Sequence, residues 1–463
     1  MGPWLLLLFI VGDILGTGIY ALTGRVAGEV GGAVWIPFLV AFGVAMVTGL
    51  SYLELVTKYP QAAGAALYTH KAFGIHFVTF MVTFAVMSSG ITSAATAAKA
   101  FAANFAEAFE FDGKGPLLTV IALAFMAAVA AINLRGVGES VKANVLLTCV
   151  ELSGLLIVVC IGLWALGFGN GDFGRIIEFD TGDRTAFGGV IAATTLAFYA
   201  MVGFEDSVNM AEETKEPTRI FPRILLTGLL ITGAIYVVVS ITAVALVPPE
   251  ELAEGDTPLL QVVKIGAPGF PTQIFAFITM FAVANSALIN MLMASRLLYG
   301  MAEHKVIPRV LGRVDRRRRT PYIAILFTTL PAFGLLAFVD QVPELGGTTA
   351  LLLLVVFTIV NIAVLVLRRD RVTHEHFHTP TPLPVLGAVC CAYLATPFTD
   401  RNPQQYAIAG VLLVVGVVLW AFTALWNKQH NVRPVGPGVD IRPPAASSAQ
   451  VAGFPAVRGN SRK

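Results

Sequence analysis

The sequence predicts an all-α polytopic membrane protein with twelve transmembrane helices. Three observations predict this class: the composition, the length of the apolar stretches, and the charge of the loops between them. Of the 463 residues, 56% are hydrophobic and only 13% are charged, whereas an ordinary soluble protein is about 25% charged. The mean hydropathy is +0.76. A composition this apolar excludes an ordinary water-soluble protein.

Twelve apolar stretches are long enough to cross a bilayer, which takes about 20 helical residues. They cover residues 4–23, 33–56, 76–104, 116–134, 144–168, 187–210, 223–247, 271–300, 321–339, 348–367, 383–399 and 406–426. Residues 428–463 carry scattered Pro, Gly, Ser and basic side chains without periodicity, which predicts a disordered cytoplasmic tail. The transmembrane domain is therefore expected over residues 1–427.

The loops alternate in charge along the chain. Basic side chains follow each even-numbered stretch: Lys58, Lys71, Arg135, Lys142, Lys215, Arg219, Lys305, Arg309, Arg368, Arg369 and Arg371. The loops after the fifth and seventh stretches are acidic instead, with Asp172 and Glu250 among their residues. Because cytoplasmic loops are enriched in Lys and Arg, both termini are predicted to lie in the cytoplasm. The same rule explains the run from Arg316 to Arg319, so no nucleic-acid partner is predicted.

The first apolar stretch contains a segment that is costly for a membrane anchor, VGDILGTGIYALTG at residues 11–24. Each glycine inside a helix costs about 1 kcal/mol relative to alanine. Asp13 near a bilayer centre costs about 2.5 kcal/mol or more. We interpret the segment as a helix broken at Gly16, Thr17 and Gly18, since irregular backbone is tolerated in a membrane only where it is buried in protein or lines a cavity.

The half-helix after this break presents N–H groups and the positive end of its dipole, which suits a substrate carboxylate. Ile19 would supply an apolar wall beside it. A second interpretation is close helix packing through small residues, because Gly12 and Gly16 have the G-x-x-x-G spacing.

A second break is predicted in the sixth stretch, which reads TTLAFYAMVGFEDSVNMAEE. Its candidate binding residues are Phe198, Tyr199, Ala200, Val202 and Gly203. Freed carbonyls there could accept from an ammonium group, and an aromatic ring could close over the site; ordinary packing of that ring in the core is the alternative. Breaks at corresponding positions of two halves point to inverted repeats, here of five helices each, over about 1–168 and 187–367, followed by two further helices at about 383–426.

Charged side chains inside the stretches suggest further roles. Glu151 and Asp13 are candidate ion-coupling residues, because an intramembrane carboxylate is a functional hypothesis by default; Ser295 is grouped with them. A salt bridge or hydrogen bond to a neighbouring helix is the alternative for Glu151. Four charged residues lie at the ends of the second and sixth stretches: Glu54, Glu212, Glu213 and Lys215. They are candidate gate residues, and the alternative is that they are solvated residues at helix ends.

Two polar stripes run along predicted helices. Ser89 with Ser93, and Ser286 with Asn290, are i, i+4 pairs that line cavities or join helices. The sequence contains no Walker motif and no hydrolytic or H-E-x-x-H signature, so neither an ATP-driven pump nor an enzyme is predicted, and neither a cofactor nor a metal.

Four blocks of sequence resemble the amino acid–polyamine–organocation transporter superfamily, nearest its cationic amino acid transporter branch. The blocks are GDILGTGIYALTG; the loop residues Tyr59, Pro60, Ala63, Gly64, Tyr68, Phe73 and Gly74; AFYAMVGFEDSVNMAEETKEP with Arg219 and Pro222; and Ser295, Arg296, Tyr299, Ala302, Pro308, Thr320 and Pro321. The resemblance implies a leucine-transporter-like fold of two five-helix inverted repeats plus two helices, and alternating access around a substrate held by both breaks.

The resemblance also implies a secondary transporter of amino acids, cationic ones or polyamines included, in the cytoplasmic membrane, proton-coupled or exchanging. Members of the family often carry a Lys near the position of Glu151, so the Glu leaves the coupling ion open. Alternatives are a non-transporting amino acid sensor and a sodium-coupled amine transporter. The expected partners are the substrate and membrane lipids, and the sequence does not decide between a monomer and a homodimer.

Overall fold

The computed structural model describes residues 2–61, 64–111, 115–136, 140–304, 306–315, 318 and 320–429. For residues 140–144, 210, 212 and 213 it describes the backbone alone. All regular elements of the described part are helices, and its one β-type contact is an isolated bridge between Gly31 and Phe179. The predicted all-α class is therefore confirmed, whereas the predicted tail falls almost entirely outside the described residues.

Ten helices of the described part are long and apolar enough to cross a membrane. They are α1 (Pro3–Val30), α2 (Trp35–Lys58), α4 (His76–Ala108), α5 (Pro116–Arg135), α6 (Ser140–Gly167), the segment that begins with α7 (Ala186–Ala197), α8 (Pro217–Leu246), α11 (Thr272–Glu303), α13 (Val342–Leu367) and α15 (Pro403–Gln429). Two shorter apolar helices, α12 (Tyr322–Phe338) and α14 (Pro382–Leu394), occupy the ninth and eleventh predicted stretches.

Helix boundaries differ from the sequence prediction at the end of α1, which runs seven residues past the predicted residue 23 to Val30, and where a proline starts a helix. Pro217 opens α8 six residues before the predicted start, and α13 begins at Val342 with Pro343 in its first turn. Proline is favoured there because its missing N–H has no partner to lose. Three short helices also lie in predicted loops: α3 (Gly64–Phe73), α9 (Pro249–Ala253) and α10 (Pro258–Gly266).

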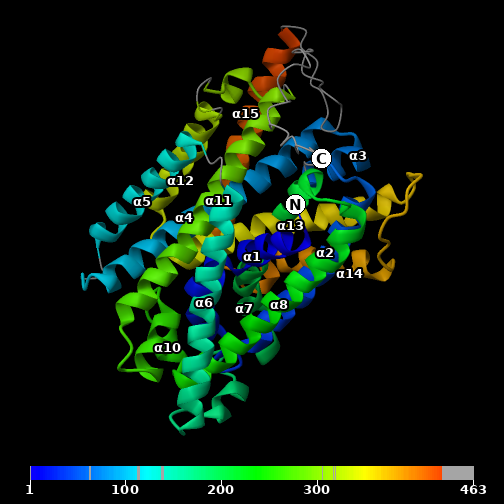
Figure 1. The fold of residues 1–463 in the computed structure, drawn as a ribbon. Helices are drawn as coiled ribbons and strands as arrows, with labels where there is room; N and C mark the ends of the chain where they lie inside the picture. Colours follow the sequence, from blue (N-terminus) through cyan, green and yellow to red (C-terminus); the bar gives the residue numbers. More distant parts are fainter. Residues whose placement is uncertain are drawn as a thin grey trace, which may run out of the picture.

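Helix α1 lies in the middle of the bundle (Figure 1) and packs against α6, α7, α8 and α9. Of its most apolar window, 78% is buried in protein, against 22% for α15. Helices α5 and α12 lie together on one flank, and α14 lies beside α2 on the other (Figure 1). The helix with the most glycine and a carboxylate is therefore the one best shielded from lipid, as irregular backbone in a membrane requires.

The end of α2 is fastened to the chain between α13 and α14 by a buried ion pair. Nε and Nη2 of Arg368 lie 2.8 Å from the two carboxylate oxygens of Glu54, which is 1% exposed. The backbone N–H of Thr379 donates to the same carboxylate at 2.9 Å. The bidentate geometry adds direction as well as energy to this contact.

We predict that Glu54→Ala lowers the stability of the protein by about 3 kcal/mol or more, because it leaves the Arg368 guanidinium without its counter-charge. Glu216→Ala is the matched control: its pair with Arg219 is 70% to 76% exposed, so about 0.5 kcal/mol or less is expected. Thermal unfolding in detergent measures both, and equal midpoints for the two variants would contradict the prediction.

Candidate functional site

Helix α1 is interrupted at Gly16, whose backbone angles are φ 19° and ψ −159°. The carbonyls of Ile14 and Leu15, just before the interruption, turn toward α8. The hydroxyl of Tyr236 donates to this pair of oxygens, at 2.6 Å from that of Ile14 and 2.8 Å from that of Leu15. The hydroxyl of a residue in another helix thus hydrogen-bonds the two carbonyls that a regular helix would have paired with its own N–H groups. This removes the cost of leaving backbone acceptors unpaired inside a membrane.

A second interruption follows α7. The α-helix ends at Ala197 and tightens into a 3-10 turn, η2 (Phe198–Met201). Val202 is extended (φ −78°, ψ 151°), and Gly203 has φ 122°, which side chains other than hydrogen rarely allow. A second 3-10 segment, η3 (Asp206–Glu213), follows, and its residues Ser207, Val208 and Ala211 are buried.

The two interruptions touch each other at two points. A Cβ on Gly18 would lie 2.4 Å from Cα of Ala200, and a Cβ on Gly203 would lie 2.7 Å from the carbonyl oxygen of Asp13. Both distances are too short for any side chain. Glycine is therefore required on each side so that the backbone of one interruption can rest on the backbone of the other.

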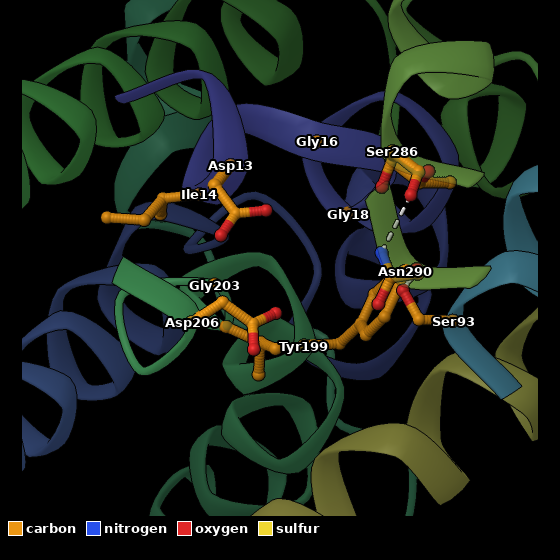
Figure 2. A pocket seen from close by; sticks show the side chains of 12 residues that line it. Asp13, Ile14, Gly16, Gly18, Ser93, Tyr199, Gly203, Asp206, Ser286 and Asn290 are labelled. Carbon is orange, nitrogen blue, oxygen red and sulfur yellow. Dashed lines mark hydrogen bonds between the residues drawn. The ribbon is translucent and has the colours of Figure 1, made fainter. Parts of the chain in front are cut away.

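A central cavity lies between the interruptions (Figure 2) and is closed by α4 and α11. Its lining residues are Asp13, Ile14, Gly16, Thr17, Gly18, Ser93, Tyr199, Val202, Gly203, Asp206, Ser286 and Asn290. The cavity volume is about 20 Å³, on a scale where one water molecule needs about 10–15 Å³. Any ligand larger than one or two water molecules would therefore require the surrounding helices to move apart.

The structure brings most of the predicted binding residues to this cavity. Gly16, Thr17, Gly18, Tyr199, Val202 and Gly203 line it, whereas Ile19, Phe198 and Ala200 do not. Phe198 packs against Phe357 at 6.1 Å between ring centres, and Ala200 faces Gly18. The polar stripes contribute too: Ser93 contacts the hydroxyl of Tyr199 at 3.1 Å, and Asn290 donates to the Ser286 carbonyl at 2.8 Å.

Two carboxyl groups face the central cavity, one from each interruption. Asp13 and Asp206 point toward the same space (Figure 2). One carboxylate oxygen of Asp13 is buried and has no hydrogen-bond partner within the described part of the chain. Asp206 also lines a second cavity of about 20 Å³, which Glu205 and residues of α2, α3 and α4 complete. Asp206 therefore lies between the polar central cavity and a second, mostly apolar cavity.

Glu151 lies on α6 beside α1, outside the lining of the central cavity. It is fully buried, and neither carboxylate oxygen has a partner among the described residues. The hydroxyl of Tyr20 donates at 2.8 Å to its backbone carbonyl instead. Ser295, the third predicted coupling residue, donates to the carbonyl of Leu292 in its own helix at 2.8 Å and does not line the cavity.

The four predicted gate residues come from two places in the fold, the end of α2 and the end of η3. Glu54 is held in the ion pair with Arg368 described above. Glu212 and Glu213 end η3, and their side chains are outside the described structure. Lys215 is exposed in the turn that follows. Their gating role stays a prediction.

Sequence reasoning missed three contributors to the site: Ile14, Asp206 and Tyr236. Asp206 follows the Gly203 break by three residues, and its position as an acid within an apolar stretch was the available signal. Tyr236 lies in an apolar segment of α8, 222 residues from Ile14 in the chain. No local pattern indicates such a contact.

The fold and site together define a multi-pass membrane protein with a polar cavity between two interrupted helices. A model of the family described as "Amino acid permease" matches residues 1–425. The chain belongs to this family, within the superfamily that its motifs resemble.

The relatives of this chain are named for different substrates. The chain is 24% identical to the branched-chain amino acid permease BcaP of Bacillus subtilis over 93% of both chains. It is 26% identical to the chloroplastic cationic amino acid transporter 9 of Arabidopsis thaliana, over 96% of this chain and 81% of the relative. It is also 22% identical to the methylthioribose transporter of Bacillus subtilis, over 91% and 92%. The relatives indicate a transporter of the permease type and leave the substrate undetermined.

We predict that Gly18→Ala destabilises the protein by about 1–3 kcal/mol, since overpacking of this size forces a backbone shift. The added Cβ would meet the backbone of Ala200, which cannot rotate away. Gly43→Ala is the matched control, because nothing lies within 4 Å of its Cβ position; it should leave stability unchanged or raised. Thermal unfolding in detergent compares the two, and a Gly18→Ala protein as stable as the control would refute the close contact.

Proposed function

We propose that the protein is a secondary active transporter of amino acids or related amines in the cytoplasmic membrane, working by alternating access. The observation that carries the proposal is the polar cavity enclosed by the two helix interruptions. In transporters with interrupted helices, substrates bind at the repeat interface near the bilayer midplane. The small volume of the cavity supports a closed state of a site that opens in turn to each side.

The substrate carboxylate is assigned to the first interruption. Gly16, Thr17 and Gly18 line the cavity there, and glycine lets a ligand approach the backbone N–H groups closely. The half-helix that follows directs the positive end of its dipole toward the cavity, which favours an anion. The substrate ammonium group is assigned to the opposite side, where Asp13 and Asp206 present their carboxyl groups.

Glu151 is proposed as the proton-coupling residue. A buried carboxylate with no hydrogen-bond partner is costly to keep charged, and both oxygens of Glu151 are in that state among the described residues. Asp13 lies within electrostatic reach of Glu151, Glu205 and Asp206, so a proton on one acid favours the charged state of the next. Sodium coupling of an amine transporter and a non-transporting sensor are the alternatives.

The proposal extends to topology. Twelve spans, arranged as two inverted repeats of five helices followed by two more, are supported by the two interruptions and by α12 and α14 in the predicted stretches. The basic loops support cytoplasmic termini.

The function is tested with the purified protein in two steps. A thermal-shift screen against amino acids and polyamines identifies ligands, since a ligand at 100 times its Kd stabilises the folded state by about 2.7 kcal/mol. Each hit is then tested for counterflow in proteoliposomes. Saturable counterflow is expected; a ligand that binds without flux would favour the sensor, and unsaturable conductance would favour a channel.

We predict that Glu151→Gln abolishes the stimulation of uptake by an inward proton gradient, because the amide can no longer carry a proton. Exchange of substrate without a gradient should persist. Glu250→Gln changes an exposed residue of the short helix α9; it is the matched control and should keep the gradient effect. Radiolabelled uptake at equal protein density measures all three proteins, and full stimulation in Glu151→Gln would remove the coupling role.

A further inference from the structure

An apolar groove of about 590 Å³ lies between α4, α12 and α15. Its polar lining side chains are those of Ser88 and Gln404, and the others are apolar. Ser93, which lines the central cavity, follows Phe84 of the groove by nine residues of α4, or about two and a half helical turns. The apolar groove therefore lies behind α4, on the face opposite to the central cavity.

The floor of the apolar groove is buried, while its rim projects outward. Phe84, Met87 and Ile91 of α4 form the floor and are 1% to 2% exposed. Leu330 and Phe338 of α12 stand at the rim and are 72% and 86% exposed. Contiguous exposed apolar surface marks an interaction site. In a multi-pass membrane protein, the molecules that surround such a surface are lipids.

The length of the apolar groove matches one leaflet of a bilayer. Along α15 the lining runs from Gln404 to Val415, which is about 16 Å at 1.5 Å per residue. Half of the hydrocarbon core of a bilayer is about 15 Å thick. A helix of the same length and 10–12 Å across would occupy about 1,200 Å³ or more, which is twice the volume of the groove. The groove therefore fits an extended acyl chain and is too small for a helix of another protein chain.

A cation stands near one end of the apolar groove. Lys99 lies on α4 eight residues beyond Ile91, and its ammonium group donates to the Asp340 carbonyl at 3.1 Å. Asp340 directly follows Val339 of the groove lining. Lys99 has no carboxylate within 4.0 Å in the part of the chain that the structure describes, and the charges of Asp340 and Asp256 act on it from further away. The ammonium charge is therefore only partly compensated by the protein.

The position of Lys99 along α4 corresponds to the depth of a phospholipid headgroup. Phe84 closes the other end of the groove, because a Cβ on Gly416 of α15 would lie 2.6 Å from its ring. From Phe84 to Lys99, α4 rises by about 22 Å. Half of a bilayer, headgroups included, is about 20–22 Å thick. A lipid whose chain ends at Phe84 therefore has its phosphate beside Lys99.

We propose that the apolar groove binds one anionic phospholipid, with an acyl chain between α12 and α15 and its phosphate at Lys99. The chain supplies the dispersion contacts that an unfilled groove would forfeit, and it supports α4 from behind the central cavity. The inference does not depend on the proposed transport function. The competing occupant is a smaller apolar molecule with one hydrogen-bonding group, because the buried Ser88 hydroxyl has no partner among the described residues.

The test is a titration of delipidated full-length protein with phosphatidylglycerol in detergent. Native mass spectrometry counts the bound lipids and gives the Kd of the first. Wild-type protein should bind one equivalent at least tenfold more tightly than the next. Gly334→Phe should weaken this equivalent at least tenfold, because nothing lies within 4 Å of the Cβ position and the ring would fill the groove.

Two further variants sharpen the test. Gly410→Phe is the matched control, because its Cβ position on α15 is equally open but lies outside the groove lining; its Kd should equal that of the wild type. Lys99→Gln should raise the Kd about fivefold, as expected for one cation near an anionic headgroup.

Several results would overturn the inference. They are the absence of a preferred equivalent in wild-type protein, and an unchanged Kd in Gly334→Phe or in Lys99→Gln. A dimer that Gly334→Phe dissociates would assign the groove to a second copy of the chain. A smaller bound mass, present in purified wild-type protein and lost in Gly334→Phe, would assign it to the competing occupant. The wild-type stoichiometry and Lys99→Gln decide the question even where Gly334→Phe does not fold.

Discussion

The direct contact between the backbones of the two helix interruptions is the constraint on which the rest of the structure depends. Gly18 rests on Ala200, and Gly203 rests on the carbonyl of Asp13. These approaches bring both interruptions within reach of one small space. Helices that were merely packed through side chains would stand further apart, with apolar atoms between them. The cavity, its two carboxyl groups and its closure all follow from the absence of two Cβ atoms.

Irregular backbone inside a bilayer also needs hydrogen-bond partners that replace regular helix. The structure supplies them from distant parts of the chain: Tyr236 covers the carbonyls before the first interruption, and the Glu205 carboxylate accepts from the N–H of Gly203 at 2.8 Å in the second. Hydrogen bonds between hydroxyl groups also join neighbouring helices, such as that between Thr92 of α4 and Thr349 of α13 at 2.7 Å. Polar groups here hold the helices together, since apolar burial gives little driving force in lipid.

The sequence was informative where the physics is local. Apolar stretches of membrane length and the glycines at positions 16, 18 and 203 predicted the helices and both interruptions, because each feature violates or obeys a rule within a few residues. The side-chain directions were harder. Ile19 and Phe198 are buried but do not line the cavity, and hydrophobicity alone does not tell which buried side chain faces a cavity and which packs in the core. Tyr236 and Asp206 depend on neighbours far along the chain, so only the folded structure assigns them.

One packing detail has a mechanical consequence. Helix α6 touches α1 on both sides of the interruption: a Cβ on Gly12 would lie 1.9 Å from Oγ1 of Thr148, and a Cβ on Gly154 would lie 2.7 Å from Oη of Tyr20. Glu151 lies between Thr148 and Gly154 along α6. Because α6 packs against α1 both before and after Gly16, it braces the two halves of α1 against each other. Glu151 therefore lies on the helix that contacts α1 closely at both Gly12 and Tyr20, on either side of Gly16.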